Sequence, residues 1–184
     1  MVDQLALFSA PRPRAVFSPC TECGSCPNDD CPWRHYRYFL EWPTGIANSR
    51  VVLFALANPS TASAEQTDAT VARCIDYARR WDFGWCWVVN ARAWRSTDPS
   101  AVPADPEAIG PENDEHVTRA ASLADLVVCG WGKLAGHRGP EMLRIIRNAG
   151  KVPHALKLNE DGSPSHPLYL AAALRPFLME DAHG

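Results

Sequence analysis

The sequence predicts a three-layer α/β/α sandwich with a mostly parallel central sheet. Three short runs of β-favouring residues (50–57, 85–90 and 125–129) are apolar almost throughout, which is typical of strands buried on both faces. Segments with helical spacing of apolar residues separate these runs. Because a strand, a helix and a second strand in that order place the strands parallel, the alternation favours a sheet covered by helices on both faces.

The remaining elements extend this layout at both ends. Alternating apolar residues over 35–42 predict a first strand, and residues 152–158 predict a last core strand. Helices are expected over residues 65–81, 112–123 and 140–149. A short helix is expected at the C-terminus, after the Ser-His-Pro motif at 165–167.

The 184 residues suffice for one well-packed domain but not for two. Residues 1–18 contain two prolines and no periodicity, and we expect an extended or disordered arm. Residues 19–33 hold a cysteine-rich loop, and residues 34–184 form the α/β domain.

The net charge of −3 gives no global basic field of the kind that nucleic-acid binders often carry. Locally, residues 133–157 hold six Lys/Arg against one acid, whereas 98–125 hold seven acids against one Arg. One side is therefore suited to phosphate, although solvated helix faces explain the same pattern. With no apolar run of membrane length and no secretory-type N-terminus, we expect a cytoplasmic, membrane-free protein, by default a monomer.

Four of the seven cysteines lie within twelve residues, in the pattern C-x2-C-x2-C-x4-C. In a reducing compartment such a cluster indicates a metal rather than disulfides. Four thiolates complete a tetrahedral zinc shell and leave no open position, so the role is structural; a 4Fe-4S cluster is the alternative. The expected ligands are Cys20, Cys23, Cys26 and Cys31. The other three cysteines (Cys74, Cys86 and Cys129) stand among apolar residues and are expected to be buried.

Polar residues follow the predicted strands. Asn58 comes after the first buried strand, Asn90 ends the second, and Gly130 to Lys133 follow the third; His166 lies in the last loop. In parallel sheets reactive groups gather at the carboxyl ends of the strands. These residues are therefore expected at one edge of the sheet.

The order and placement of four short motifs resemble those of the uracil-DNA glycosylase superfamily. The motif A-N-P-S at 57–60 is similar to its G-x-N-P-G motif, and V-V-N at 88–90 to the segment that ends in its base-reading asparagine. The motif S-H-P-L at 165–168 resembles its H-P-S loop, and G-W-G-K at 130–133 its L-W-G-S segment. Residues 34–178 also resemble an uncharacterised bacterial domain family with this fold.

The resemblance implies a DNA glycosylase that cleaves the N-glycosidic bond of a base flipped out of the helix. Asn58 would position the water; as an amide it orients the water but removes no proton at neutral pH. Asn90 would pair with the edge of the base. His166 would donate a hydrogen bond to the carbonyl on which negative charge develops.

Two departures from the superfamily bear on the substrate. Uracil-specific members carry Asp at the position of Asn58, and an aromatic residue soon after the proline excludes a 5-methyl group. Here Ser60 and Thr61 are small, so we expect a base pocket that admits 5-substituted or otherwise enlarged bases. DNA contacts are expected from Lys133, Arg138, Leu168 and Tyr169.

Other readings of the same residues remain open. The Asn58 turn is also a suitable cap for the following helix, and Asn90 and His166 occur commonly in purely structural roles. A module that binds a modified base without catalysis and a hydrolase of free nucleosides or nucleotides are the alternative functions. The sequence has no Walker loop, H-E-x-x-H or G-x-S-x-G motif, and no nucleotide cofactor is expected.

Overall fold

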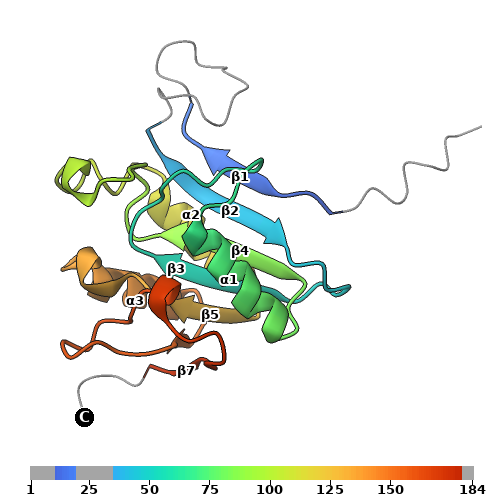
Figure 1. Cartoon of the computed structure of the whole chain (residues 1–184). Helices are drawn as coiled ribbons and strands as arrows, with labels where there is room; N and C mark the ends of the chain where they lie inside the picture. The colour runs from blue at the N-terminus through green and yellow to red at the C-terminus, as the bar shows by residue number, and fades with distance from the viewer. Residues whose placement is uncertain (1–10, 20–34, 180–184) are drawn as a thin grey trace, which may run out of the picture.

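The computed structural model describes residues 11–19 and 35–179. These residues form a seven-stranded sheet with the order β1-β2-β4-β3-β5-β6-β7 (Figure 1). The strands are β1 (Arg14–Phe17), β2 (Arg37–Pro43), β3 (Val51–Leu56), β4 (Trp85–Asn90), β5 (Leu126–Cys129), β6 (Pro153–Ala155) and β7 (Phe177–Leu178).

The four central strands are parallel, as predicted. β3 pairs with β4 on one side and β5 on the other, and β5 pairs with β6. The three outer strands are antiparallel to their neighbours: β1 to β2, β2 to β4, and β7 to β6. The carboxyl ends of β3, β4, β5 and β6 therefore share one edge of the sheet.

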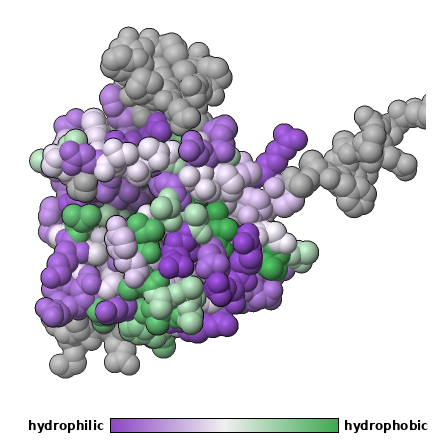
Figure 2. Space-filling view, in the orientation of Figure 1, coloured by the Kyte–Doolittle hydropathy of each residue, from purple (hydrophilic) through white to green (hydrophobic). Residues whose placement is uncertain are grey.

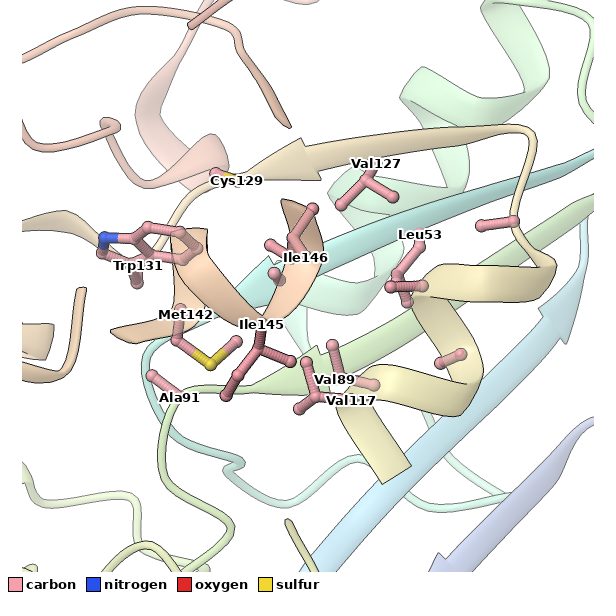
Figure 3. Close-up of a cluster of buried hydrophobic side chains, with 14 of the residues drawn as sticks. Leu53, Val89, Ala91, Val117, Val127, Cys129, Trp131, Met142, Ile145 and Ile146 are labelled. Carbon is pink, nitrogen blue, oxygen red and sulfur yellow. The ribbon is translucent and has the colours of Figure 1, made fainter. Parts of the chain in front are cut away.

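Helices cover both faces of the sheet and confirm the predicted three layers. On one face, α1 (Ala69–Arg80) packs Val71, Cys74 and Tyr77 against the sheet. On the other face lie α2 (Asn113–Leu123) and α3 (Arg138–Asn148). Figure 3 shows this second core, in which side chains of both helices meet the apolar residues of β3, β4 and β5. The three scattered cysteines are buried, as expected.

Part of the arm expected to be extended or disordered is extended, whereas the C-terminal expectation is not met. Residues Arg14–Phe17 of the expected arm form an edge strand paired with β2, and Arg14 Nε lies 2.8 Å from Glu41 Oε1. The expected C-terminal helix is wrong: a single 3-10 turn, η4 (Pro167–Tyr169), is followed by irregular chain and β7. The short apolar stretch there pairs with β6 because an edge strand satisfies its backbone groups. None of the described helices has the length and apolarity needed to cross a membrane.

Helix α1 begins four residues later than the expected start at 65. The side chain of Asp68 caps it, with Asp68 Oδ1 accepting a hydrogen bond from Val71 N at 2.8 Å. Such a cap satisfies one of the backbone N–H groups that the first turn leaves open.

We expect Leu53→Ala in β3 to lower the free energy of unfolding by about 2–5 kcal/mol, because it leaves a cavity at a fully buried position. Leu123→Ala on α2 is the matched control, since that side chain is 60% exposed; its effect should stay within about 0.5 kcal/mol. Urea unfolding followed by circular dichroism measures both. Equal losses would contradict the placement of Leu53 in the core.

Candidate functional site

The ends of β3, β4 and β5 are held side by side by backbone hydrogen bonds that continue past the strands. Arg92 N donates to Ala57 O at 2.9 Å, and Gly130 N donates to Ala55 O at 2.8 Å. Ser96 N donates to Pro59 O at 3.0 Å, so the loops after β3 and β4 also run together. The shared edge predicted from the sequence is therefore present.

The side chain of Asn58 is fixed in one orientation. Its Nδ2 donates to Pro59 O at 3.3 Å and to Ser96 O at 3.1 Å. Since carbonyl oxygens only accept hydrogen bonds, these contacts place the amide nitrogen on the backbone side. Asn58 Oδ1 makes no hydrogen bond within the described part of the chain, and it is therefore open to accept one from a water or a substrate.

Asn90 is buried at the end of β4 and is held by Arg37. Arg37 Nη2 donates to Asn90 Oδ1 at 3.1 Å, and Arg37 Nη1 donates to Ala62 O at 2.8 Å. The guanidinium has donors only, so the amide of Asn90 turns its oxygen towards Arg37. Asn90 Nδ2 and Arg37 Nε are buried and have no hydrogen-bond partner among the described residues. The pair thus offers two unfilled donors to an incoming acceptor.

The charge of Arg37 is poorly compensated. Its side chain is only 2% exposed, and among the described residues no carboxylate lies within ion-pair distance of it. Burial lowers the pKa of Arg37 to about 10, while the charge of Asp68 acts in the opposite direction. The guanidinium still carries its proton at neutral pH. Arg37 therefore places a positive charge next to the amide oxygen of Asn90.

His166 is half-buried in the loop before η4. Its Nδ1 accepts a long hydrogen bond of 3.4 Å from Leu168 N, which leaves the proton of the neutral ring on Nε2. Burial lowers the pKa of His166, and the charge of Asp68 partly offsets this. The ring is therefore neutral at pH 7 and carries a donor at Nε2. Its loop packs closely on the end of β5, where a Cβ on Gly130 would lie 2.9 Å from Pro167 Cδ.

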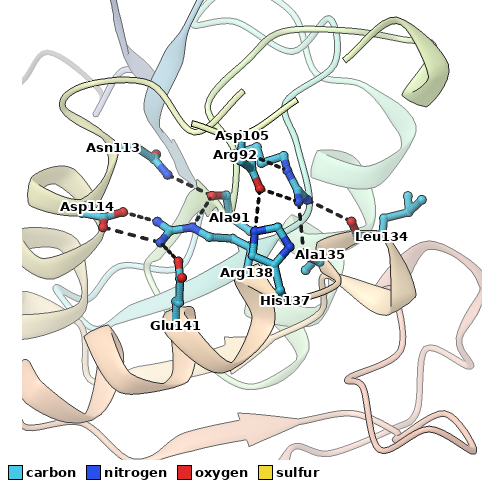
Figure 4. Close-up of polar contacts among 10 residues, drawn as sticks. All are labelled: Ala91, Arg92, Asp105, Asn113, Asp114, Leu134, Ala135, His137, Arg138 and Glu141. Carbon is cyan, nitrogen blue, oxygen red and sulfur yellow. Dashed lines mark hydrogen bonds and ion pairs between the residues drawn. The ribbon is translucent and has the colours of Figure 1, made fainter. Parts of the chain in front are cut away.

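A pocket of about 340 Å³ opens beside Asn58. Its polar wall is a chain of charged groups, shown in Figure 4. Arg92 forms a bidentate ion pair with Asp105, with Nε–Oδ1 and Nη2–Oδ2 distances of 2.9 Å. His137 Nε2 lies 3.1 Å from Asp105 Oδ2. Arg92 also donates to Leu134 O at 2.9 Å and Ala135 O at 3.3 Å. These contacts tie the end of β4 to η3 (Gly132–Ala135).

The residues expected to contact DNA differ in their exposure to solvent. Lys133 is exposed and lies 3.9 Å from Asp161, and Tyr169 is 87% exposed. Leu168 is half-buried. On the face shown in Figure 2, apolar residues form small separate patches among hydrophilic ones.

The position of Arg138 does not fit the DNA contact expected of it. Its side chain is only 2% exposed, pairs with Asp114 and Glu141, and donates to Ala91 O at 3.0 Å. Its donors are committed inside the domain, so the expected phosphate contact is wrong. Arg138 instead joins α2 and α3 to the end of β4, as Figure 4 shows.

The two residues expected beside the base lie on the loop after β3. Ser60 is half-buried and Thr61 is exposed. The four cysteines expected to bind metal (Cys20, Cys23, Cys26 and Cys31) lie outside the described residues.

Comparison with known proteins gives one match. Residues 37–168 match the model of a family described as "Protein of unknown function (DUF1643)". The chain belongs to the DUF1643 family. No curated protein and no solved structure matches it. The matched DUF1643 region runs from Arg37 to Leu168, so it contains Asn58, Asn90 and His166 but not the cysteine loop.

Three residues of the site were not anticipated. Arg37 carried one signal, a charge at the start of an otherwise apolar strand. Asp105 and His137 carried none, because Asp105 stands in a Pro- and Asp-rich loop and His137 in a glycine-rich segment. Their contact joins residues that are far apart in the chain.

The lowered pKa of His166 makes stability depend on pH. Below the ordinary histidine value of about 6.5 the unfolded chain takes up a proton that the folded site resists. We therefore expect the free energy of unfolding to fall as the pH drops from 7 through this range. His166→Asn should remove this part of the slope in urea unfolding between pH 7.5 and about pH 5. Identical slopes in the two proteins would contradict the buried, neutral state of the ring.

Proposed function

We propose that the protein is a DNA glycosylase that hydrolyses the N-glycosidic bond of a flipped-out modified or damaged base. One observation carries the proposal: three side chains at one sheet edge have complementary unfilled hydrogen-bonding atoms. Asn58 offers an acceptor, Asn90 a buried donor, and His166 a neutral ring with a donor at Nε2. These are the groups that such a hydrolysis needs.

The reaction separates charge, and the site offers donors to the departing base and an acceptor to the attacking water. As the bond to the base lengthens, the sugar becomes positive and the base negative. Asn90 Nδ2 and His166 Nε2 are donors suited to the carbonyl oxygens of the departing base. Arg37, fixed to Asn90 Oδ1, adds positive charge behind that amide. The attacking water hydrogen-bonds to Asn58 Oδ1.

The base pocket in this proposal admits a 5-substituted pyrimidine. Residues 60–64, close after Asn58, carry only small side chains, with Ser60 half-buried and Thr61 exposed. A base that is unpaired or modified leaves the stack at lower cost than a normal one, which adds to selectivity. Tyr169, exposed and three residues after His166, is suited to fill the vacated stack, with Leu168 beside it and Lys133 on a phosphate.

The proposal is tested with a panel of duplex and single-stranded DNAs that carry uracil, hypoxanthine, or 5-substituted or glucosylated pyrimidines. Released base is detected by mass spectrometry, and abasic sites by alkaline cleavage. We expect release from one class of modified base. Removing one preorganised donor typically costs about 100-fold in rate, so His166→Ala should lower base release by at least that factor. Asn58→Ala removes the acceptor that orients the water, and we expect it to lower base release as well.

The outcomes separate the proposal from its alternatives. Salt-sensitive binding of modified DNA without turnover would instead indicate a non-catalytic binding module. Release from free nucleosides or nucleotides, with no binding of DNA, would indicate a nucleoside hydrolase. Base release that persists in both variants would place the chemistry elsewhere in the molecule.

We also propose that the cysteine loop binds one structural zinc ion through Cys20, Cys23, Cys26 and Cys31. Four thiolates are a complete donor set for tetrahedral zinc. Metal analysis of purified protein should give about one zinc per chain and no colour, and Cys23→Ser should lower this content and the thermal stability. A brown protein that contains iron would instead indicate an iron–sulfur cluster.

A further inference from the structure

We infer that His137, oriented by Asp105, is the general base that takes the proton from the water held by Asn58. This inference rests on the proposed function, because it names the proton acceptor of that hydrolysis. It adds a catalytic residue outside the motifs from which the function was proposed.

The need for such a base follows from the chemistry of the residues already described. The amide of Asn58 is not basic at neutral pH and only orients the water. His166 uses Nδ1 as an acceptor and presents a proton at Nε2, so it is arranged as a donor to the base. Arg37 holds its proton. None of these three residues is arranged to receive the proton of the attacking water.

His137 is arranged to receive it. It lines the same 340 Å³ pocket as Asn58, a volume in the range of small-ligand sites. Its Nε2 lies 3.1 Å from Asp105 Oδ2, and a carboxylate only accepts, so the ring proton sits on Nε2 and Nδ1 has a free lone pair. The ring is 70% exposed, so a substrate entering the pocket reaches it.

Asp105 is well suited to fix this orientation. Its side chain is only 13% exposed, and both carboxylate oxygens accept hydrogen bonds from Arg92. Arg92 in turn donates to Leu134 O and Ala135 O, three and two residues before His137 in the chain. The carboxylate therefore cannot turn away from the ring without breaking several charge-assisted bonds. Asp105 is a positioning residue in this scheme, and Arg92 supports it.

The water oxygen forms a bond to the anomeric carbon of the sugar while the carbon–nitrogen bond breaks, and that electron pair leaves with the base. The water proton passes to His137 Nδ1 and then to solvent. The products are the free base, after protonation, and an abasic sugar.

The test measures base release with the substrate identified by the panel above. His137→Gln keeps an amide that can donate to Asp105 but removes the basic nitrogen. We expect it to lower kcat about 100-fold with little change in KM, as for loss of a general base, and to leave the thermal unfolding midpoint near that of the wild type. His154→Gln, which changes a histidine on β6 outside the pocket, is the matched control and should keep the wild-type rate.

Chemical rescue separates a base from a structural residue. Added imidazole should restore activity to His137→Ala but not to Asn58→Ala, because only the first variant lacks a proton acceptor. Base release by His137→Gln at the wild-type rate, or no rescue of His137→Ala, would overturn the inference and leave the glycosylase proposal standing. Absence of base release by the wild type on every substrate would overturn both.

Discussion

The pairing of β3 with β4 and β5 is the constraint on which the site depends. β3 lies at the centre of the parallel strands and is buried along its whole length. Its register with β4 sets Leu56 opposite Asn90, and its register with β5 sets Ala55 opposite Cys129. A shift of one residue would reverse the faces of every side chain. The same pairing that fills the two cores therefore fixes which side chains meet at the edge.

The burial of Arg37 lowers the stability of that edge when no ligand is bound. Removing a guanidinium from water costs several kcal/mol unless opposite charge compensates it. Here its partners are one backbone carbonyl and one amide oxygen, and Nε has no partner among the described residues. Such an arrangement is destabilising without a ligand and favourable for an acceptor that gains negative charge. It supports the proposed function, in which the departing base gains negative charge.

The sequence predicted the parts of the molecule that depend on local pattern. Continuous apolar runs located β3, β4 and β5, and the polar residues at their ends located Asn58 and Asn90 at the shared edge. The contacts that complete the site are of another kind. Arg37 and Asn90 are 53 residues apart, and His137 and Asp105 come from a helix end and a loop. No periodicity encodes such pairs, because they arise only when the layers pack.

Arg138 shows why charge patterns alone mislead. It belongs to a basic stretch that favoured a solvated or phosphate-binding surface, yet it is the first residue of α3 and points inward. Its Nε donates to Ala91 O, and its terminal nitrogens pair with Asp114 on α2 and Glu141 on its own helix. Two acids and a carbonyl satisfy the guanidinium, which is how a charge is tolerated inside a protein. The sign of a residue therefore does not reveal whether it faces solvent.

In the proposed hydrolysis one group of polar residues acts on the leaving base, and a second group, together with Asn58, acts on the water. Arg37, Asn90 and His166 present donors, which suits a leaving group that becomes negative. Asp105 and His137 line the same pocket as Asn58, and His137 presents an acceptor, which suits a water that loses a proton. Because the amide nitrogen of Asn58 is bound to the backbone, its oxygen alone faces the reaction. An aspartate at this position would combine water binding and proton transfer in one side chain. An asparagine leaves proton transfer to a neighbour, the role that we propose for His137.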